Sequence, residues 1–152
     1  MIGVMPFAKL VPELVCSNLE RSLHFYTEVL GFSVLYARPE ERFAYLDREG
    51  AQIMIEQPTG RALVAGELTY PYGRGINLQI EVSDVESLYS QAKAAGSVMY
   101  LHLEDKWYRR DQTLLGNRQF VVHDPEGYLL RFFEDLGQRP SSCDSLTGTL
   151  PT

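Results

Sequence analysis

The sequence contains few cysteines and no long hydrophobic segment. Two cysteines, Cys16 and Cys143, occur among 152 residues, which is too few for the disulfide framework of a small secreted domain. No apolar run approaches the roughly 18 residues of a membrane-spanning helix, and residues 1–9 lack the basic region and long apolar segment of an export signal. The sequence therefore predicts a cytoplasmic protein that does not bind membranes.

Positive charge is also scarce. The 14 Lys and Arg residues are outnumbered by 20 Asp and Glu residues, so the net charge is −6. The one dense basic patch, residues 106–110, is flanked by acidic side chains, and no basic stripe of the kind that binds nucleic acid is present. An acidic protein attracts cationic small molecules, although this charge is equally typical of a protein that is simply kept in solution.

The common catalytic motifs are missing as well. Neither a Ser-His-Asp nor a Cys-His arrangement can be assembled, and the short joint at residues 73–75 has neither Walker nor Rossmann spacing. The three histidines, His24, His102 and His123, have no metal-ligand spacing to one another. We therefore predict no catalytic residue.

What the sequence does contain is an internal repeat. Residues 13–20 (ELVCSNLE) match residues 79–86 (QIEVSDVE), and each segment leads through an amphipathic stretch to a glycine, Gly31 or Gly96, and then to SVLY or SVMY. Both copies carry Ser-x-x-Glu before the helical pattern, which predicts capping boxes that begin at Ser17 and Ser83. Because glycine is the preferred residue just after a helix, Gly31 and Gly96 mark the predicted ends of the two helices.

Each half of the repeat predicts the element order βαβββ. Three strand-like runs follow each helix, at 32–36, 42–47 and 51–57 in the first half and at 97–101, 118–123 and 128–134 in the second. The predicted fold class is α+β, one domain with two tandem βαβββ modules that form a curled mixed sheet with a concave cleft. The modules span 9–58 and 76–136, joined by the connecting segment 59–75 and followed by a flexible tail, 137–152.

Alternation along the strands places a mixed set of side chains on the face opposite the core. Candidate ligand-binding residues on this face are Glu13, Met54, Glu56, Asn77, Gln79, Arg131 and Phe133. Two interpretations of this mixed set of side chains are open. The face is either simply exposed to solvent, or it is a groove in which polar and apolar groups converge on a ligand. The predicted loop 101–116 adds Trp107 and Tyr108, whose rings could stack on a flat ligand or pack within the protein.

Two motifs point to a known family. Residues 23–26 (LHFY) with 29–32 (VLGF), and residues 124–133 (DPEGYLLRFF), make the chain resemble the vicinal oxygen chelate superfamily over residues 9–136. That superfamily includes glyoxalase I, extradiol dioxygenases, and fosfomycin- and bleomycin-resistance proteins. The resemblance implies paired βαβββ modules around a U-shaped cleft, which a second subunit often completes.

The resemblance also implies where a divalent metal would bind. Carried over by position, the four ligand sites fall on Val11, Glu56, Asn77 and Arg131, and a shift of two residues would replace Val11 by Glu13. Only Glu56 is a competent ligand, because valine has no donor atom, asparagine is a weak neutral donor and arginine is a permanent cation. We therefore predict no metal and no cofactor, with Arg131 paired to Glu56 or Glu13.

Such a cleft without a metal resembles the bleomycin-resistance proteins, homodimers that sequester a bulky cationic drug without making or breaking bonds. The leading hypothesis is a metal-free binding protein of this type, which sequesters a bulky cationic antibiotic or a related cationic or aromatic metabolite in a dimer groove. The alternatives are a metal-dependent glyoxalase- or dioxygenase-like lyase or isomerase, which could also use Glu56 as a general base, and a regulatory module that binds a peptide.

Overall fold

The computed structural model describes residues 6–141. The first module consists of β1 (Glu13–Val15), α1 (Leu19–His24), the π-helical turn η1 (Phe25–Val29), β2 (Ser33–Arg38), the 3-10 turn η2 (Pro39–Glu41), β3 (Phe43–Arg48) and β4 (Ala51–Glu56). The second consists of β5 (Asn77–Glu81), α2 (Val85–Ala94), β6 (Met99–Arg110), β7 (Thr113–His123) and β8 (Leu129–Pro140). No helix among these elements is long and apolar enough to cross a membrane.

The α+β class and the repeat are confirmed. Each module forms its own four-stranded sheet, in the orders β1-β4-β3-β2 and β5-β8-β7-β6. In both sheets the first strand pairs parallel with the last, and the other pairings are antiparallel. The cleft-forming surface is therefore divided between two mixed sheets, where the sequence predicted one curled sheet.

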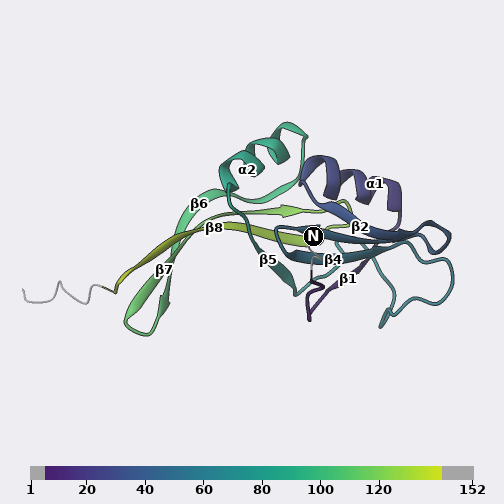
Figure 1. Cartoon of the computed structure of the whole chain (residues 1–152), viewed down its shortest axis with the longest axis horizontal. Helices are drawn as coiled ribbons and strands as arrows, with labels where there is room; N and C mark the ends of the chain where they lie inside the picture. The colour runs from purple at the N-terminus through teal and green to yellow at the C-terminus, as the bar shows by residue number, and fades with distance from the viewer. Residues whose placement is uncertain (1–5, 142–152) are drawn as a thin grey trace, which may run out of the picture.

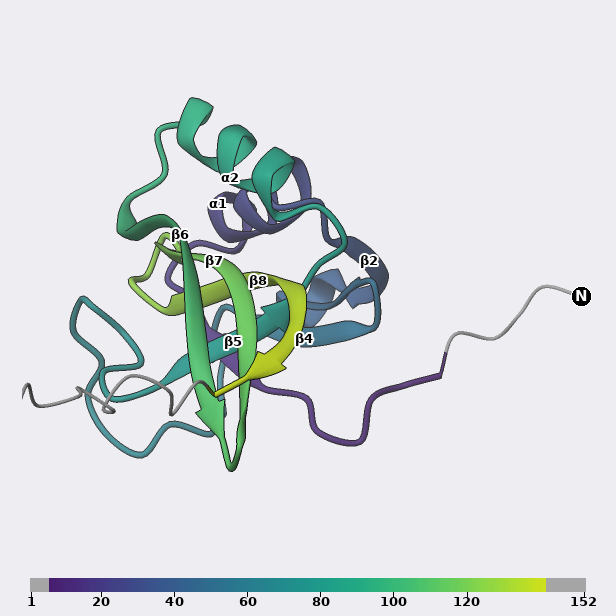
Figure 2. The ribbon, with the colours of Figure 1, turned by 90° about the vertical axis from the view of Figure 1, so that its left-hand side faces the viewer.

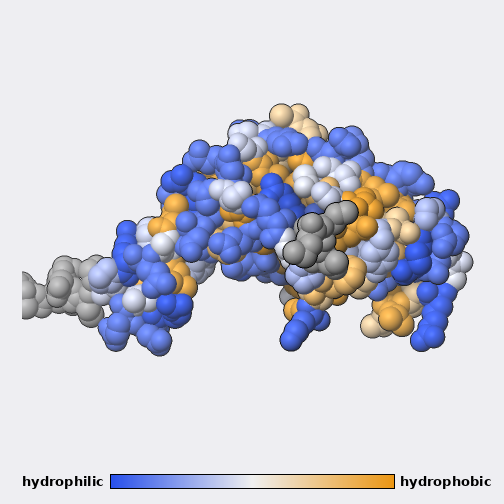
Figure 3. Space-filling view, in the orientation of Figure 1, coloured by the Kyte–Doolittle hydropathy of each residue, from blue (hydrophilic) through white to orange (hydrophobic). Residues whose placement is uncertain are grey.

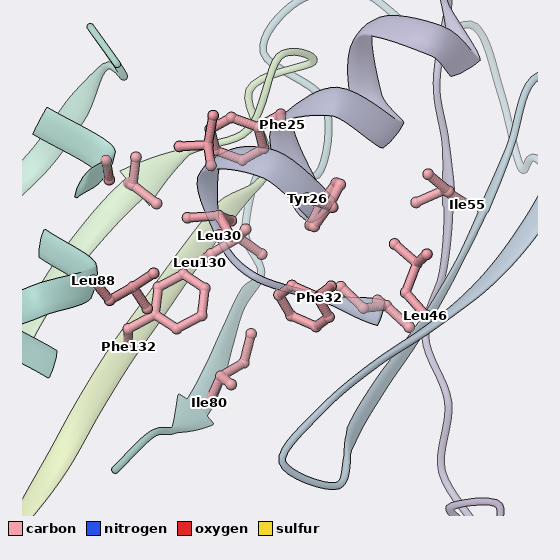
Figure 4. Close-up of a cluster of buried hydrophobic side chains, with 14 of the residues drawn as sticks. Phe25, Tyr26, Leu30, Phe32, Leu46, Ile55, Ile80, Leu88, Leu130 and Phe132 are labelled. Carbon is pink, nitrogen blue, oxygen red and sulfur yellow. The ribbon is translucent and has the colours of Figure 1, made fainter. Parts of the chain in front are cut away.

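Both helices lie on the same side of the two sheets (Figures 1 and 2), and the core lies between the helices and the strands. The core cluster joins the two modules: Tyr26 and Leu30 from the first module and Leu130 and Phe132 from the second are fully buried (Figure 4). Burial alternates along β4 and β8 as predicted, with Ile53 and Ile55, or Leu130 and Phe132, facing the core.

The prediction that residues 101–116 form a loop is wrong. Strands β6 and β7 form a long hairpin that turns at Asp111 and Gln112. Together with the end of β8 this hairpin makes an arm, defined as residues 104–118 and 135–140, that projects from the helix-covered body (Figure 1). Most of the arm is exposed or half-buried on both faces, so its sequence lacks the apolar alternation that identifies a half-buried strand. Strand β8 continues to Pro140, which also corrects the start of the predicted flexible tail; Cys143 and residues 142–152 lie outside the described residues.

The predicted capping boxes are also wrong by one residue. The N-caps are Asn18, whose side chain accepts from the Arg21 N–H, and Asp84, whose side chain accepts from the Ser87 N–H. Asn and Asp cap helices as well as Ser does. Ser17 and Ser83 instead use their backbone N–H groups to bind the other module: Ser17 donates to Glu126 at 2.8 Å, and Ser83 donates to Glu49 at 3.2 Å.

The two motifs that carried the family resemblance meet at the boundary between the modules. The hydroxyl of Tyr26, on η1, donates to Asp124 Oδ2 across 2.8 Å in the buried core. Asp124 Oδ1 accepts from the backbone N–H groups of Glu126 and Tyr128. Burial raises the pKa of the Asp124 carboxyl to about 6, although these three hydrogen bonds favour its ionised form. These motifs therefore join the modules in the structure.

Candidate functional site

Each sheet has a groove on the face that points away from the core. The groove of the first module, which we call the β4 groove, encloses about 280 Å³ and is lined by Glu13, Tyr36, Arg38, Phe43, Met54, Glu56, Arg61 and Leu63. The groove of the second module, the β8 groove, encloses about 430 Å³ and is lined by Gln79, Glu81, Tyr108, Arg110, Leu115, Asn117, Arg131, Phe133, Asp135 and Gln138. Figure 3 shows the underside of the molecule hollowed between the arm and the body.

Aromatic rings form one wall of the β4 groove. Tyr36 stacks on Tyr45 with ring centroids 5.0 Å apart, and the Arg38 guanidinium lies 3.9 Å from the centre of the Phe43 ring. Arg38 also pairs with Glu41 at 2.6 Å, so its charge is already compensated. This wall offers ring faces to a flat or cationic ligand.

Two carboxylates lie together on the floor of the same groove. Because β1 runs parallel to β4 with Glu13 opposite Met54 and Val15 opposite Glu56, the Glu13 and Glu56 side chains project from the same face. The adjacent Glu56 carboxyl and partial burial raise the pKa of the Glu13 carboxyl to about 6. Near neutral pH the pair therefore attracts a cation or holds one proton.

In the β8 groove the central charge is Arg131. Its Nη2 donates to Gln79 Oε1 at 2.5 Å, and Gln79 is its neighbour in the parallel β5–β8 register. No carboxylate lies within ion-pair distance of Arg131 in residues 6–141. The predicted pairing of Arg131 with Glu56 or Glu13 is therefore wrong, because those acids belong to the other sheet and the other groove.

A buried side-chain amide, that of Gln119, positions the residues at the outer part of the β8 groove. Gln119, 2% exposed, donates from Nε2 to Glu104 Oε1 at 3.1 Å and to the Tyr108 hydroxyl at 2.7 Å, and its Oε1 accepts from that hydroxyl at 3.0 Å. This network fixes Tyr108 against the groove. Sequence reasoning missed Gln119 and the arm residues of the groove, although a β7 strand extended to residue 113 would have placed Leu115, Asn117 and Gln119 on one face.

The structure separates the predicted site residues into groups. Glu13, Met54 and Glu56 line the β4 groove, whereas Gln79, Tyr108, Arg131 and Phe133 line the β8 groove. Asn77 lines neither groove. It contributes to a third, mainly apolar pocket of about 350 Å³ beside the N-terminal residues Ala8 and Leu10.

Trp107 lies on the opposite face of the arm from Tyr108. It pairs with Gly116 across the hairpin, and a Cβ at residue 116 would come within 2.7 Å of the indole ring. The Arg139 guanidinium covers the ring at 4.0 Å from its centroid. Trp107 therefore packs within the arm and does not line either groove.

The strand register tests the metal positions that the resemblance implied. Glu13 and Gln79 are equivalent in the repeat, and they lie opposite Met54 and Arg131 respectively. The counterpart of Arg131 is thus Met54, while Glu56 corresponds to Phe133. The resemblance placed a ligand site at Glu56, and the register corrects that position to Met54. The corrected set, Val11, Met54, Asn77 and Arg131, does not fit a divalent metal, since none of the four offers a carboxylate, imidazole or thiolate. Residues 6–141 also contain no group of three or more His, Cys, Asp or Glu side chains that could hold a metal ion.

Comparisons with known proteins agree with this architecture. The chain is 28% identical to TioX from Micromonospora sp. ML1, with 85% of this chain and 99% of that chain covered and a TM-score of 0.65. A lactoylglutathione lyase from Agrobacterium tumefaciens is 16% identical, with 85% and 94% covered and a TM-score of 0.54, which shows the shared fold alone. No curated protein matches the chain.

A glyoxalase/bleomycin resistance protein/dioxygenase from Alicyclobacillus acidocaldarius likewise shares the fold, at 19% identity, 84% and 91% coverage and a TM-score of 0.58. A model of the family matches residues 8–132, which include both modules up to the first four residues of β8. The chain therefore belongs to the Glyoxalase/Bleomycin resistance protein/Dioxygenase superfamily.

Proposed function

We propose that the protein binds a small molecule without a metal, in the manner of a bleomycin-resistance protein, and sequesters it in grooves that a second copy of the chain completes. The observation that carries this proposal is the residue set on the groove floors. Met54 and Arg131 occupy equivalent central positions, and neither is a usual ligand of Zn²⁺, Ni²⁺ or Fe²⁺. The aromatic and charged side chains around them suit recognition of an organic ligand.

The residues that line the β4 groove suit a flat, cationic part of a ligand. The carboxylate pair of this groove, Glu13 and Glu56, lies beside the rings of Tyr36 and Phe43, so a protonated amine could bind the acids while an adjoining ring contacts the aromatic wall. The net charge of −6 favours the approach of a cation.

The test is calorimetric titration of the purified protein with metal-free bleomycin, together with measurement of bound metal and of the sedimentation coefficient. We expect saturable micromolar or tighter binding, no stoichiometric metal and a dimer. The Glu56→Gln variant should bind more weakly, whereas Glu86→Gln, which removes the same charge from the exposed surface of α2, should bind normally. Absence of saturable binding to any bleomycin-family drug would contradict the proposal.

One observation favours an enzymatic alternative. Glu13, with its pKa raised to about 6 by Glu56 and by burial, has the proton affinity expected of a general base that works near neutral pH. A lyase or isomerase that removes a proton next to a carbonyl could use it. Exchange of substrate protons with deuterated solvent that disappears in Glu13→Gln, or a stoichiometric metal in the purified protein, would favour this alternative.

A further inference from the structure

Arg131 is an incompletely satisfied cation in the β8 groove. A guanidinium carries five N–H donors, yet the described hydrogen bonds of Arg131 are limited to the one from Nη2 to the neutral Gln79 amide. Its Nε is buried and has no hydrogen-bond partner. Buried polar groups in proteins are normally hydrogen-bonded. The unbonded Nε–H of Arg131 is therefore a donor that still lacks an acceptor.

Two other polar side chains in and beside this groove have partners. Gln119 is bonded to both Glu104 and Tyr108. Asp135 accepts from the Gly137 backbone N–H at 2.7 Å and so stabilises the bulge in β8. Among the described residues, the two acidic side chains that line the groove, Glu81 and Asp135, make no ion pair with Arg131. The charge of Arg131 is therefore available to a ligand.

The repeat shows that the fold does not require a charge at this position. Met54 occupies the equivalent place in the first sheet, opposite Glu13 as Arg131 is opposite Gln79. Both residues are half-buried on the groove face, and Met54 keeps the sheet intact with an apolar side chain. Arginine at residue 131 therefore gives the second groove a property that the architecture alone does not demand.

The surroundings of Arg131 indicate what kind of anion it would bind. Phe133 and Leu115 line the same groove and offer apolar contacts, while a second guanidinium, Arg110, lies on the arm side. Arginine binds carboxylates through two parallel N–H donors. A ligand with a carboxylate and an adjoining apolar part would use both features.

We propose that Arg131 binds the carboxylate of an organic anion in the β8 groove, with the apolar part of the ligand against Phe133 and Leu115. This inference rests on the proposed function, because it names a chemical group of the ligand that the grooves sequester. It assigns the Glu13–Glu56 pair of the β4 groove and the Arg131 guanidinium of the β8 groove to oppositely charged groups. The ligand class for the β8 groove is then an aromatic or otherwise apolar compound that carries a carboxylate.

The test compares two probes of the same shape, 2-naphthylacetate and its neutral amide, by NMR titration of the full chain. We expect the carboxylate to bind at least tenfold more tightly than the amide and to shift the Arg131 Nε–H and Gln79 side-chain signals. Arg131→Met should weaken carboxylate binding at least tenfold and leave amide binding unchanged, and Arg131→Lys should retain part of the preference. Arg118→Met is the matched control, because Arg118 pairs with Asp105 and Glu86 outside the groove.

The outcomes separate this inference from the proposed function. Equal affinity for acid and amide, or unchanged carboxylate binding in a folded Arg131→Met variant, overturns the carboxylate site. If metal-free bleomycin binds the wild type and neither naphthyl probe does, the carboxylate site is wrong and the proposed function stands. If the carboxylate binds at Arg131 but no bleomycin-family drug binds, the site stands and the proposed drug-sequestering function is wrong.

Discussion

Replacement of Tyr26 by Phe tests the contact that joins the two modules. The Tyr26 side chain is fully buried, so the ring of Phe fills the same space and only the hydroxyl is removed. Asp124 Oδ1 keeps its two backbone donors, whereas Oδ2, which accepts the Tyr26 hydroxyl at 2.8 Å, has no other described donor. A buried hydrogen bond to a charged group contributes about 1.5–3 kcal/mol to the free energy of unfolding. Because Tyr26→Phe leaves one carboxylate oxygen without a donor, we expect a loss near the upper part of this range, about 2–3 kcal/mol.

The loss should depend on pH in a defined direction. The pKa of Asp124 in the folded protein is about 6, above the roughly 3.9 of an unfolded aspartate, so the folded state holds the proton more tightly. The stability contributed by this protonation is full below about pH 4 and is lost as the pH rises through 6, by about 3 kcal/mol in total. Because the Tyr26 hydroxyl favours the ionised carboxylate, Tyr26→Phe should destabilise the protein more at pH 8 than at pH 5.

Urea denaturation followed by circular dichroism measures both effects. The free energy of unfolding of Tyr26→Phe should fall by about 2–3 kcal/mol at pH 8 and by about half as much at pH 5, relative to wild type at the same pH. Tyr89→Phe is the control, since its hydroxyl contacts His102 at the exposed surface and should contribute less than about 0.5 kcal/mol. A loss below about 0.5 kcal/mol at pH 8, or an equal loss at both pH values, would refute the reasoning.

Three further changes probe the module boundary, the arm and the β4 groove. Glu126→Ala removes the acceptor of a backbone N–H and a hydroxyl from the other module and should cost about 1–3 kcal/mol in urea denaturation; a neutral result would make this contact dispensable. Gly116→Ala places a Cβ 2.7 Å from the Trp107 ring, so the indole fluorescence should shift to the red, and an unchanged spectrum would contradict the packing. Carbon-13 NMR should show the Glu13 carboxyl titrating near pH 6, with its pKa lowered in Glu56→Gln; a Glu13 pKa near 4.5 in the wild type would disprove the carboxylate contact.

Sequence periodicity predicted the parts of this fold that have one buried face. Alternation in β4 and β8 placed Met54, Glu56, Arg131 and Phe133 opposite the core, because a strand between core and groove must alternate. The residues between them, Ile53, Ile55, Leu130 and Phe132, are indeed buried. The arm was missed because it extends beyond the helix-covered core, where both faces are accessible and charged residues are tolerated on either side. Its strand pairing depends on neighbouring backbone, which no local pattern reveals.

The sequence predicted on which face of the sheet each candidate site residue lies, but not which side chains lie next to it. Alternation placed Glu56 and Arg131 on groove faces, yet which groove each residue lines depends on how the two sheets are separated. An ion pair between them was a reasonable expectation from charge alone. The actual neighbours, Glu13 for Glu56 and Gln79 for Arg131, follow from the parallel registers of β1–β4 and β5–β8, and a register is a property of the folded sheet.

The location of the family motifs explains why family membership leaves the activity open. Tyr26 and Asp124 are buried together between the modules, and Glu126 binds the start of the first helix from the opposite module. These residues hold the two sheets in place and do not line either groove floor. Any activity that uses this architecture can therefore retain them. Function depends instead on the few positions that project into the grooves, and at the two equivalent central positions this chain has Met54 and Arg131. Neither residue is a usual ligand of a divalent metal, and under the proposed function this pair serves recognition of charged and aromatic groups.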